Sequence, residues 1–123
     1  MLEAYSINIA VAADSLVPFN SVSVEKGCTA KLTSPTSIEL NKCGVYMVSV
    51  DATAAASTTL QLSKDGTAQP QSQSTGTTPS FVTLVQVPTN NSCCVCSSPV
   101  TIQVLNSTAT TLDNVNICVT KVC

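Results

Sequence analysis

Cysteine is the residue type with the most chemical potential in this chain. Its thiols could form disulfides, bind zinc as thiolates, or stay reduced and pack as small apolar side chains. Because the count is odd, the cysteines cannot all pair within one chain. The seven are Cys28, Cys43, Cys93, Cys94, Cys96, Cys118 and Cys123.

The spacing of the cysteines leaves these three states open. Adjacent Cys93 and Cys94 are not expected to bond to each other, because a disulfide between neighbouring residues is strained. The spacing matches no paired CxxC motif, and the chain has no His, so a structural zinc site has the least support. The expected disulfides join strand ends, either Cys28 with Cys43 or the 93–96 segment with Cys118 or Cys123.

Side chains that could catalyse a reaction are scarce. The chain has no His and no Arg, which removes imidazole bases, Ser-His and Cys-His couples, and bidentate clamps on anions. The acids occur singly, whereas a glycosidase needs two carboxylates across a cleft. Asp51, which lies inside a predicted strand, is expected to be solvated or at the rim of an interface. We therefore expect neither enzyme activity nor a cofactor. The acids are Glu3, Asp14, Glu25, Glu39, Asp51, Asp65 and Asp113.

The charge balance limits the classes of partner that the chain is expected to bind. Five Lys and seven acids give a net charge of −2, and without clustered basic residues we expect no binding to nucleic acid. No apolar run approaches the roughly 18 to 20 residues of a membrane span, so no membrane insertion is expected. Low charge and a positive mean hydropathy of 0.32 suggest that self-association hides some apolar surface.

The elements that position these residues are predicted to be strands. Apolar residues alternate with period two through most of the chain, turn residues recur between the apolar runs, and helical periodicity is absent. This pattern predicts an all-β protein, an antiparallel sandwich or jelly roll. In the first strand, Ile7, Ile9 and Val11 are expected to share one face. Strands are predicted at 6–13, 21–25, 29–33, 38–40, 45–56, 58–63, 81–87, 100–105 and 112–122.

Two polar segments fall outside this pattern. Thr67 to Ser80 has no apolar period and predicts an exposed loop or a weak edge strand. The solvated loop is favoured, and a binding loop is the alternative. Asn90-Asn91-Ser92 and Asn106-Ser107-Thr108 match the N-glycosylation pattern. Such matches arise by chance in a chain rich in Asn, Ser and Thr.

The strand around Tyr46 is apolar on both faces. Period-two alternation places Tyr46, Val48 and Val50 on one face. Val45 and Met47 lie on the opposite face. Since an apolar second face must also be covered, this strand indicates contact with another subunit.

Two motifs resemble the tumour-necrosis-factor/C1q-like jelly roll, whose G-x-Y strand precedes an L-x-L-x-K-x-G hairpin. Here they are Gly44 to Val50, G-V-Y-M-V-S-V, and Leu60 to Gly66, L-Q-L-S-K-D-G. The small bacterial and phage versions are the most similar, such as heads of collagen-like spore-surface proteins and virion fibres. The resemblance implies a homotrimer. It places Tyr46, Val48 and Val50 in the protomer core and directs Val45, Met47, Ser49 and Asp51 toward the other subunits.

The chain also departs from the family. Ser49 stands where an aromatic residue often approaches the axis, and Asn114 to Cys118 replaces the aromatic-glycine last strand. Receptor signalling is therefore not implied.

Taken together, these patterns predict a single jelly-roll domain over residues 1–123, with 1–15 as a candidate anchoring strand. The expected function is a non-enzymatic structural or adhesive surface module that forms a homotrimer. A short chain that lacks a basic N-terminal signal region and a collagen-like stalk favours a virion component, either a capsid decoration protein or a fibre head on the virion surface. The expected further partner is a capsid protein or a host-surface ligand. The alternatives are a C1q-like head of a secreted, cell-surface or spore-surface protein, and a small zinc-thiolate binding protein.

Overall fold

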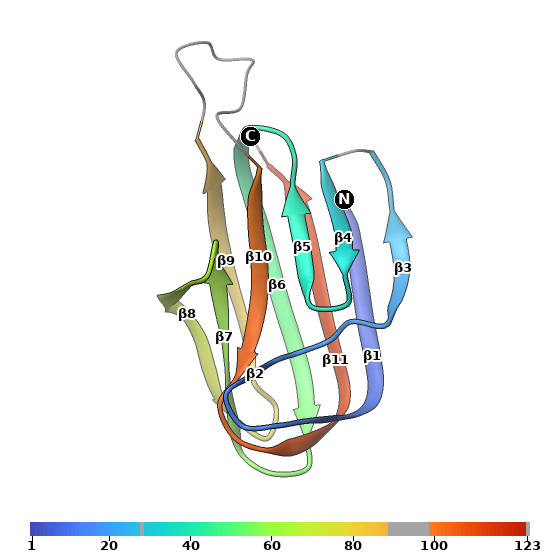
Figure 1. Ribbon diagram of the computed structural model, residues 1–123, viewed down its shortest axis with the longest axis vertical. Coiled ribbons are helices and arrows are strands. Elements are labelled where there is room, and N and C mark those ends of the chain that lie inside the picture. The colour runs from blue at the N-terminus through green and yellow to red at the C-terminus, as the bar shows by residue number, and fades with distance from the viewer. Residues whose placement is uncertain (28, 89–98, 123) are drawn as a thin grey trace.

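The computed structural model describes residues 1–27, 29–88 and 99–122, which fold into two antiparallel sheets packed face to face (Figure 1). Sheet A has the strand order β3-β1-β11-β6-β9, and sheet B has the order β4-β5-β10-β7-β8, with β2 paired to β10. The predicted all-β antiparallel sandwich is thus confirmed. Sheet A consists of β1 (Leu2–Val11), β3 (Ser21–Glu25), β6 (Gly44–Ala54), β9 (Ser80–Val87) and β11 (Thr110–Lys121). Sheet B consists of β2 (Ser15–Leu16), β4 (Ala30–Ser34), β5 (Ser37–Leu40), β7 (Thr58–Lys64), β8 (Thr67–Gly76) and β10 (Val100–Asn106).

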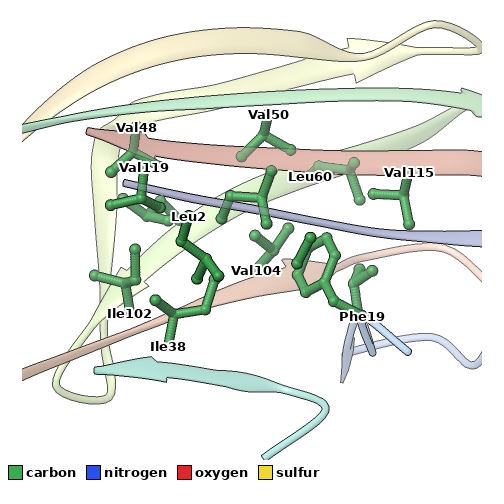
Figure 2. Packing of buried hydrophobic residues seen from close by; sticks show 14 of the residues in the cluster. Leu2, Phe19, Ile38, Val48, Val50, Leu60, Ile102, Val104, Val115 and Val119 are labelled. Atoms are coloured by element: carbon green, nitrogen blue, oxygen red, sulfur yellow. The ribbon is translucent and has the colours of Figure 1, made fainter. Parts of the chain in front are cut away.

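The core lies between the sheets, where apolar side chains from both inner faces meet (Figure 2). Strand β9 alternates exposed and buried residues along its whole length, and β10 alternates buried and half-buried ones. Only two Phe, two Tyr and no Trp are available, so Val, Ile, Leu and Ala fill most of this space. Labelled examples in Figure 2 are Leu2, Phe19, Ile38, Val48, Val50, Leu60, Ile102, Val104, Val115 and Val119.

The predicted facing of the first strand is wrong. Ile7 is 64% exposed, whereas Val11 is buried, so the two do not share a face. Asn8 has a φ of 52°, which interrupts the extended backbone and breaks the period-two alternation. Before this kink the buried positions are Leu2, Ala4 and Ser6.

The N-terminal strand is paired along its length with β11, and β3 pairs with its other side only from Leu2 to Tyr5. The anchoring role of residues 1–15 stays a prediction.

Thr67 to Ser80 is not the solvated loop that was favoured. Residues up to Gly76 form β8, the edge strand of sheet B. Its side chains are polar on both faces, and an edge strand needs only one paired neighbour, so apolar alternation is weak here. The buried hydroxyls of Ser72 and Thr83 bond at 2.7 Å and tie β8 to β9 of the other sheet.

Asp65 and Gly66 form the turn that connects β7 to β8. Their φ angles are 50° and 84°, and two consecutive positive values are typical of the tight hairpin turn that Asp-Gly favours. The Asp65 carboxylate also accepts a 2.9 Å hydrogen bond from the backbone N–H of Thr101. The hairpin predicted from this dipeptide is therefore present.

Strand β3 departs from its predicted pattern. Val22 and Val24 alternate in sequence, yet both are exposed. The strand is the edge of sheet A and pairs with β1 through a register shift at Glu3 and Ala4. An edge strand in this position gains little cover from sheet B.

Within the described residues, no helix is long and apolar enough to cross a membrane.

Candidate functional site: the outer face of sheet A

Strand β6 presents two different faces. Tyr46, Val48 and Val50 are fully buried between the sheets. On the other face, Met47 is 42% exposed. Asp51, two outward positions further along the strand, is also exposed, and Val45 and Ser49 on either side of Met47 are half-buried.

Tyr46 combines an apolar ring in the core with a hydroxyl that reaches the backbone. The hydroxyl donates to the carbonyl of Lys42 at 2.7 Å and accepts from the N–H of the same residue at 3.3 Å. It also lies 3.3 Å from the carbonyl of Thr29. A buried Tyr needs such partners, and here they fix the chain that enters β6.

An apolar patch covers the outer side of β6 and β9. Met47 pairs with Leu84, and the next outward position, Ser49, pairs with Val82. Leu84 is 62% exposed and Val82 is 63% exposed. We call Met47, Val82 and Leu84 the β6–β9 patch. Soluble monomers rarely leave large apolar side chains grouped in this way without a partner.

Polar side chains lie beside the patch on β11. Asn116, Cys118 and Thr120 pair with the outward positions of β6. Cys118 pairs with Ser49 on one side and with Glu3 of β1 on the other. We call Asn116, Cys118 and Thr120 the β11 stripe. The outer face of sheet A is therefore apolar at the β6–β9 side and polar along its middle.

Glu3 and Cys118 form a thiol–carboxylate pair in this polar part. Glu3 accepts hydrogen bonds from the hydroxyl of Ser23 at 2.5 Å and from the thiol of Cys118 at 3.0 Å. The Ser23 hydroxyl first, then Cys118 and Asn116, hold the pKa of Glu3 below its usual value. Burial first, then the hydrogen bond to Glu3 and its charge, raises the pKa of Cys118 to about 11. The thiol is thus neutral at physiological pH and a poor nucleophile.

Asp51 lies at the end of the polar part. Its carboxylate accepts a 2.6 Å hydrogen bond from the hydroxyl of Ser80, the residue that pairs with it on β9. This contact ties the carboxylate to β9, next to the Val82 end of the apolar patch.

The structure describes only part of the cysteine set. Cys43 and Cys118 are half-buried, and Cys118 carries a free thiol. Among the described residues, no three acidic or thiol side chains come together as metal ligands. The pairings suggested by the spacing and the zinc-thiolate alternative depend on residues outside the described ranges, which are Cys28, Cys93, Cys94, Cys96 and Cys123.

Val82 and Leu84 were not among the site residues predicted from the sequence. The signal was present in F-V-T-L-V-Q-V, residues 81–87, where both alternating sets contain apolar side chains.

The glycosylation pattern at Asn106 does not mark an accessible site in the folded chain, because this residue is fully buried. The other acceptor, Asn90, lies outside the described residues.

No ligand-sized cavity opens in the part of the chain that the structure describes.

Solved structures match this fold over almost its whole length. The globular domain of zebrafish complement 1qA protein matches with a TM-score of 0.75 and 9% identity, covering 99% of this chain and 96% of that one. Murine APRIL matches with a TM-score of 0.68 and 9% identity, covering 98% of each chain. Rabbit GITRL matches with a TM-score of 0.61 and 10% identity, covering 100% of this chain and 95% of that one.

At these identities the likeness shows the fold: the chain has the tumour-necrosis-factor/C1q-like jelly-roll fold. No protein-family model matches the sequence, and no curated protein matches it.

Proposed function

We propose that this chain is a non-enzymatic surface module that functions as a homotrimer built on the outer face of sheet A. The observation that carries the proposal is the β6–β9 patch, where Met47, Val82 and Leu84 are exposed together. In this proposal residues 1–123 act as one jelly-roll domain. Val45, Met47, Ser49 and Asp51 face the other subunits, while Tyr46, Val48 and Val50 hold the protomer together.

The size of the face limits the contacts that it can make. Sheet A has five strands, which at about 4.8 Å per strand give a width of about 24 Å. Strand β6 has 11 residues, which at about 3.3 Å per residue give a length of about 36 Å. The resulting upper bound of about 870 Å² per copy is divided between the two contacts that a copy makes in a ring of three, so this face can supply a small interface on each side.

The number three is supported by the fold. The sequence motifs resemble a superfamily whose domains assemble as homotrimers, and the full-length match to solved structures of that fold agrees with the resemblance. The absence of His and Arg from the sequence supports a non-enzymatic role.

Within this class we propose a virion component, either a capsid decoration protein or a fibre head that contacts a capsid protein or a host-surface ligand. The head of a secreted or spore-surface protein is the second candidate, and the match to the complement 1qA globular domain favours it. Immunogold labelling of particles and cells from the source organism separates the two. Gold on virions supports the first role, and gold on cell or spore surfaces overturns it.

Native mass spectrometry and sedimentation test the trimer. We expect the wild-type chain to be a trimer at micromolar concentration and Met47→Asp to be a folded monomer, because a carboxylate would be buried against apolar neighbours. Gln73→Asp, an exposed substitution on β8, is the matched control and should remain a trimer. A wild-type monomer at micromolar concentration would refute the proposal. A Met47→Asp variant that stays trimeric would show that another surface mediates assembly.

A further inference from the structure

The outer face of sheet A carries a second apolar patch, on the side opposite the first. Ile7 on β1 is 64% exposed, and Val24 on β3 is 40% exposed. Tyr5, between Ile7 and Glu3 on the outward side of β1, is half-buried. We call Tyr5, Ile7 and Val24 the β1–β3 patch.

The two patches lie at opposite ends of the same face. One line of paired residues starts at Val82 of the β6–β9 patch, passes through Ser49, Cys118 and Glu3, and ends at Val24 of the β1–β3 patch. This line crosses five strands, which places its ends about 19 Å apart. The two patches are therefore separate surfaces that one small contact could not cover.

The polar part between the patches has partners within the chain. The thiol of Cys118 donates to Glu3 at 3.0 Å, and the hydroxyl of Ser80 donates to Asp51 at 2.6 Å. Glu3 and Asp51 are carboxylates with few partners, and removing them from water is costly, so this middle region favours hydration. The exposed apolar side chains at the two sides of this face are the groups that would gain free energy from burial.

Symmetry connects the two patches. In a closed ring of three copies, each contact is heterologous, so one surface of a copy meets a different surface of the next copy. A trimer therefore requires two complementary surfaces on every copy, and sheet A offers two apolar ones. A two-fold dimer stacked face to face could also pair the two patches, but it would bury the carboxylates of Glu3 and Asp51 between the two sheets.

We infer that the β6–β9 patch of each copy packs against the β1–β3 patch of the next copy around the ring. This inference rests on the proposed trimer and adds the surface that receives the first patch. The partner that fits the β1–β3 patch is a second copy of this chain.

Charge complementation tests the inference. The first variant carries Val82→Asp and Leu84→Asp, and the second carries Ile7→Lys and Val24→Lys. Each should assemble at least about a hundredfold more weakly than wild type, because every contact would then bury charge against apolar surface. The combined variant, with all four substitutions in one chain, sets Asp against Lys at every contact. It should regain the trimer at low salt and lose it again at about 1 M salt.

The controls make each outcome decisive. Gln71→Asp with Gln73→Asp adds the same charge on the exposed β8 and should leave a trimer. A trimer that survives Ile7→Lys with Val24→Lys overturns the inference. So does a combined variant that stays as dissociated at low salt as the first variant. A wild-type monomer would instead overturn the trimer itself, and sedimentation of the unmodified chain shows this before any variant is made.

Footprinting replaces the variants if they fail to fold. Hydroxyl-radical labelling of the wild-type trimer should spare Ile7, Val24, Val82 and Leu84, although each is exposed in the single chain. Labelling of Ile7 and Val24 at the rate of Val22, which is 41% exposed, would overturn the inference.

Discussion

Asn106→Asp is expected to weaken the sandwich more than its small chemical change suggests. Asn106 is fully buried at the end of β10. Its amide nitrogen donates to the carbonyls of Ala12 at 3.1 Å and Thr108 at 2.8 Å, and its amide oxygen accepts from the hydroxyl of Thr58 at 2.5 Å. The side chain thus joins the end of β1, the start of β7 and the turn that precedes β11.

The magnitude follows from the two donated hydrogen bonds. An aspartate has nearly the same shape but donates nothing when ionised, so the part-buried carbonyls of Ala12 and Thr108 would face a carboxylate oxygen. Each lost bond costs about 1 kcal/mol, and each buried group left unpaired costs about 1 to 3 kcal/mol. We expect a loss of about 3 to 5 kcal/mol in the free energy of unfolding at pH 7, a large part of the 5 to 15 kcal/mol typical of a folded domain.

The loss should depend on pH. Burial would raise the pKa of the new carboxyl above its usual value of about 3.9, because the charged form is disfavoured. The protonated acid can still donate one hydrogen bond, so the variant is closest to wild type below pH 4. The deficit then grows as the pH rises through the raised pKa.

Urea unfolding at pH 4 and pH 7 measures the effect. Protein concentration must be fixed, because assembly raises apparent stability by mass action. Asn20→Asp, an exposed substitution of the same type, is the control and should change stability by less than about 0.5 kcal/mol. A loss under about 1 kcal/mol at pH 7 for Asn106→Asp would show that the amide does not hold these segments together.

Three further predictions concern single side chains. Native Cys118 should react slowly with iodoacetamide at pH 8, since its pKa is about 11. The Glu3→Gln variant should be labelled faster at Cys118, and peptide mass spectrometry measures both rates. The neutral thiol of Cys118 contributes its full share to the free energy of unfolding below about pH 9, and this contribution is lost as the pH rises through about 11. Tyr46→Phe should cost about 1 to 2 kcal/mol in urea unfolding, and Tyr46→Ala about 3 to 5 kcal/mol. Thr83→Val should cost about 1 to 3 kcal/mol, because the buried hydroxyl of Ser72 loses its partner. A wild-type labelling rate for Glu3→Gln, or wild-type stability for Tyr46→Phe or Thr83→Val, would contradict the corresponding argument.

The parts of the fold that sequence predicts well are those where one interaction dominates. Strand β6 is extended along its whole length and sits between two neighbours, so burial imposes a regular alternation on Tyr46, Val48 and Val50. Strand β1 was predicted less well because Asn8 adopts a left-handed conformation. Asn tolerates this conformation better than most residues, but the apolar alternation around it gave the stronger signal. Strand β8 was predicted poorly because its pairing is supplied by β7 and its own side chains contribute little apolar burial.

Only the β6 part of the candidate site could be predicted from the sequence, for a related reason. Apolarity on both faces of β6 indicated a covered surface, but the extent of that surface depends on which strand lies beside Met47. Register places Leu84 there, and no local pattern fixes that pairing, because β6 and β9 are separated along the chain by two strands of the other sheet. The same limit applies to Val24, whose position opposite Glu3 depends on a register shift between β1 and β3.

The two outer faces differ in how their side chains are satisfied, and this difference sets how much each face would gain from burial. On sheet B, polar side chains bond to one another or to the backbone. The amide of Gln103 donates to the hydroxyl of Ser37 at 2.8 Å, the hydroxyls of Thr59 and Thr75 bond at 2.6 Å, and the amide of Gln61 donates to a backbone carbonyl at 3.1 Å. Together with the paired charges of Lys31 and Glu39, such a surface stays hydrated and gains little from burial. Exposed apolar side chains on sheet A make no such bonds and gain about 25 cal/mol for each Å² removed from water. A chain with few charged residues can therefore keep one face in solvent and direct its self-association through the other.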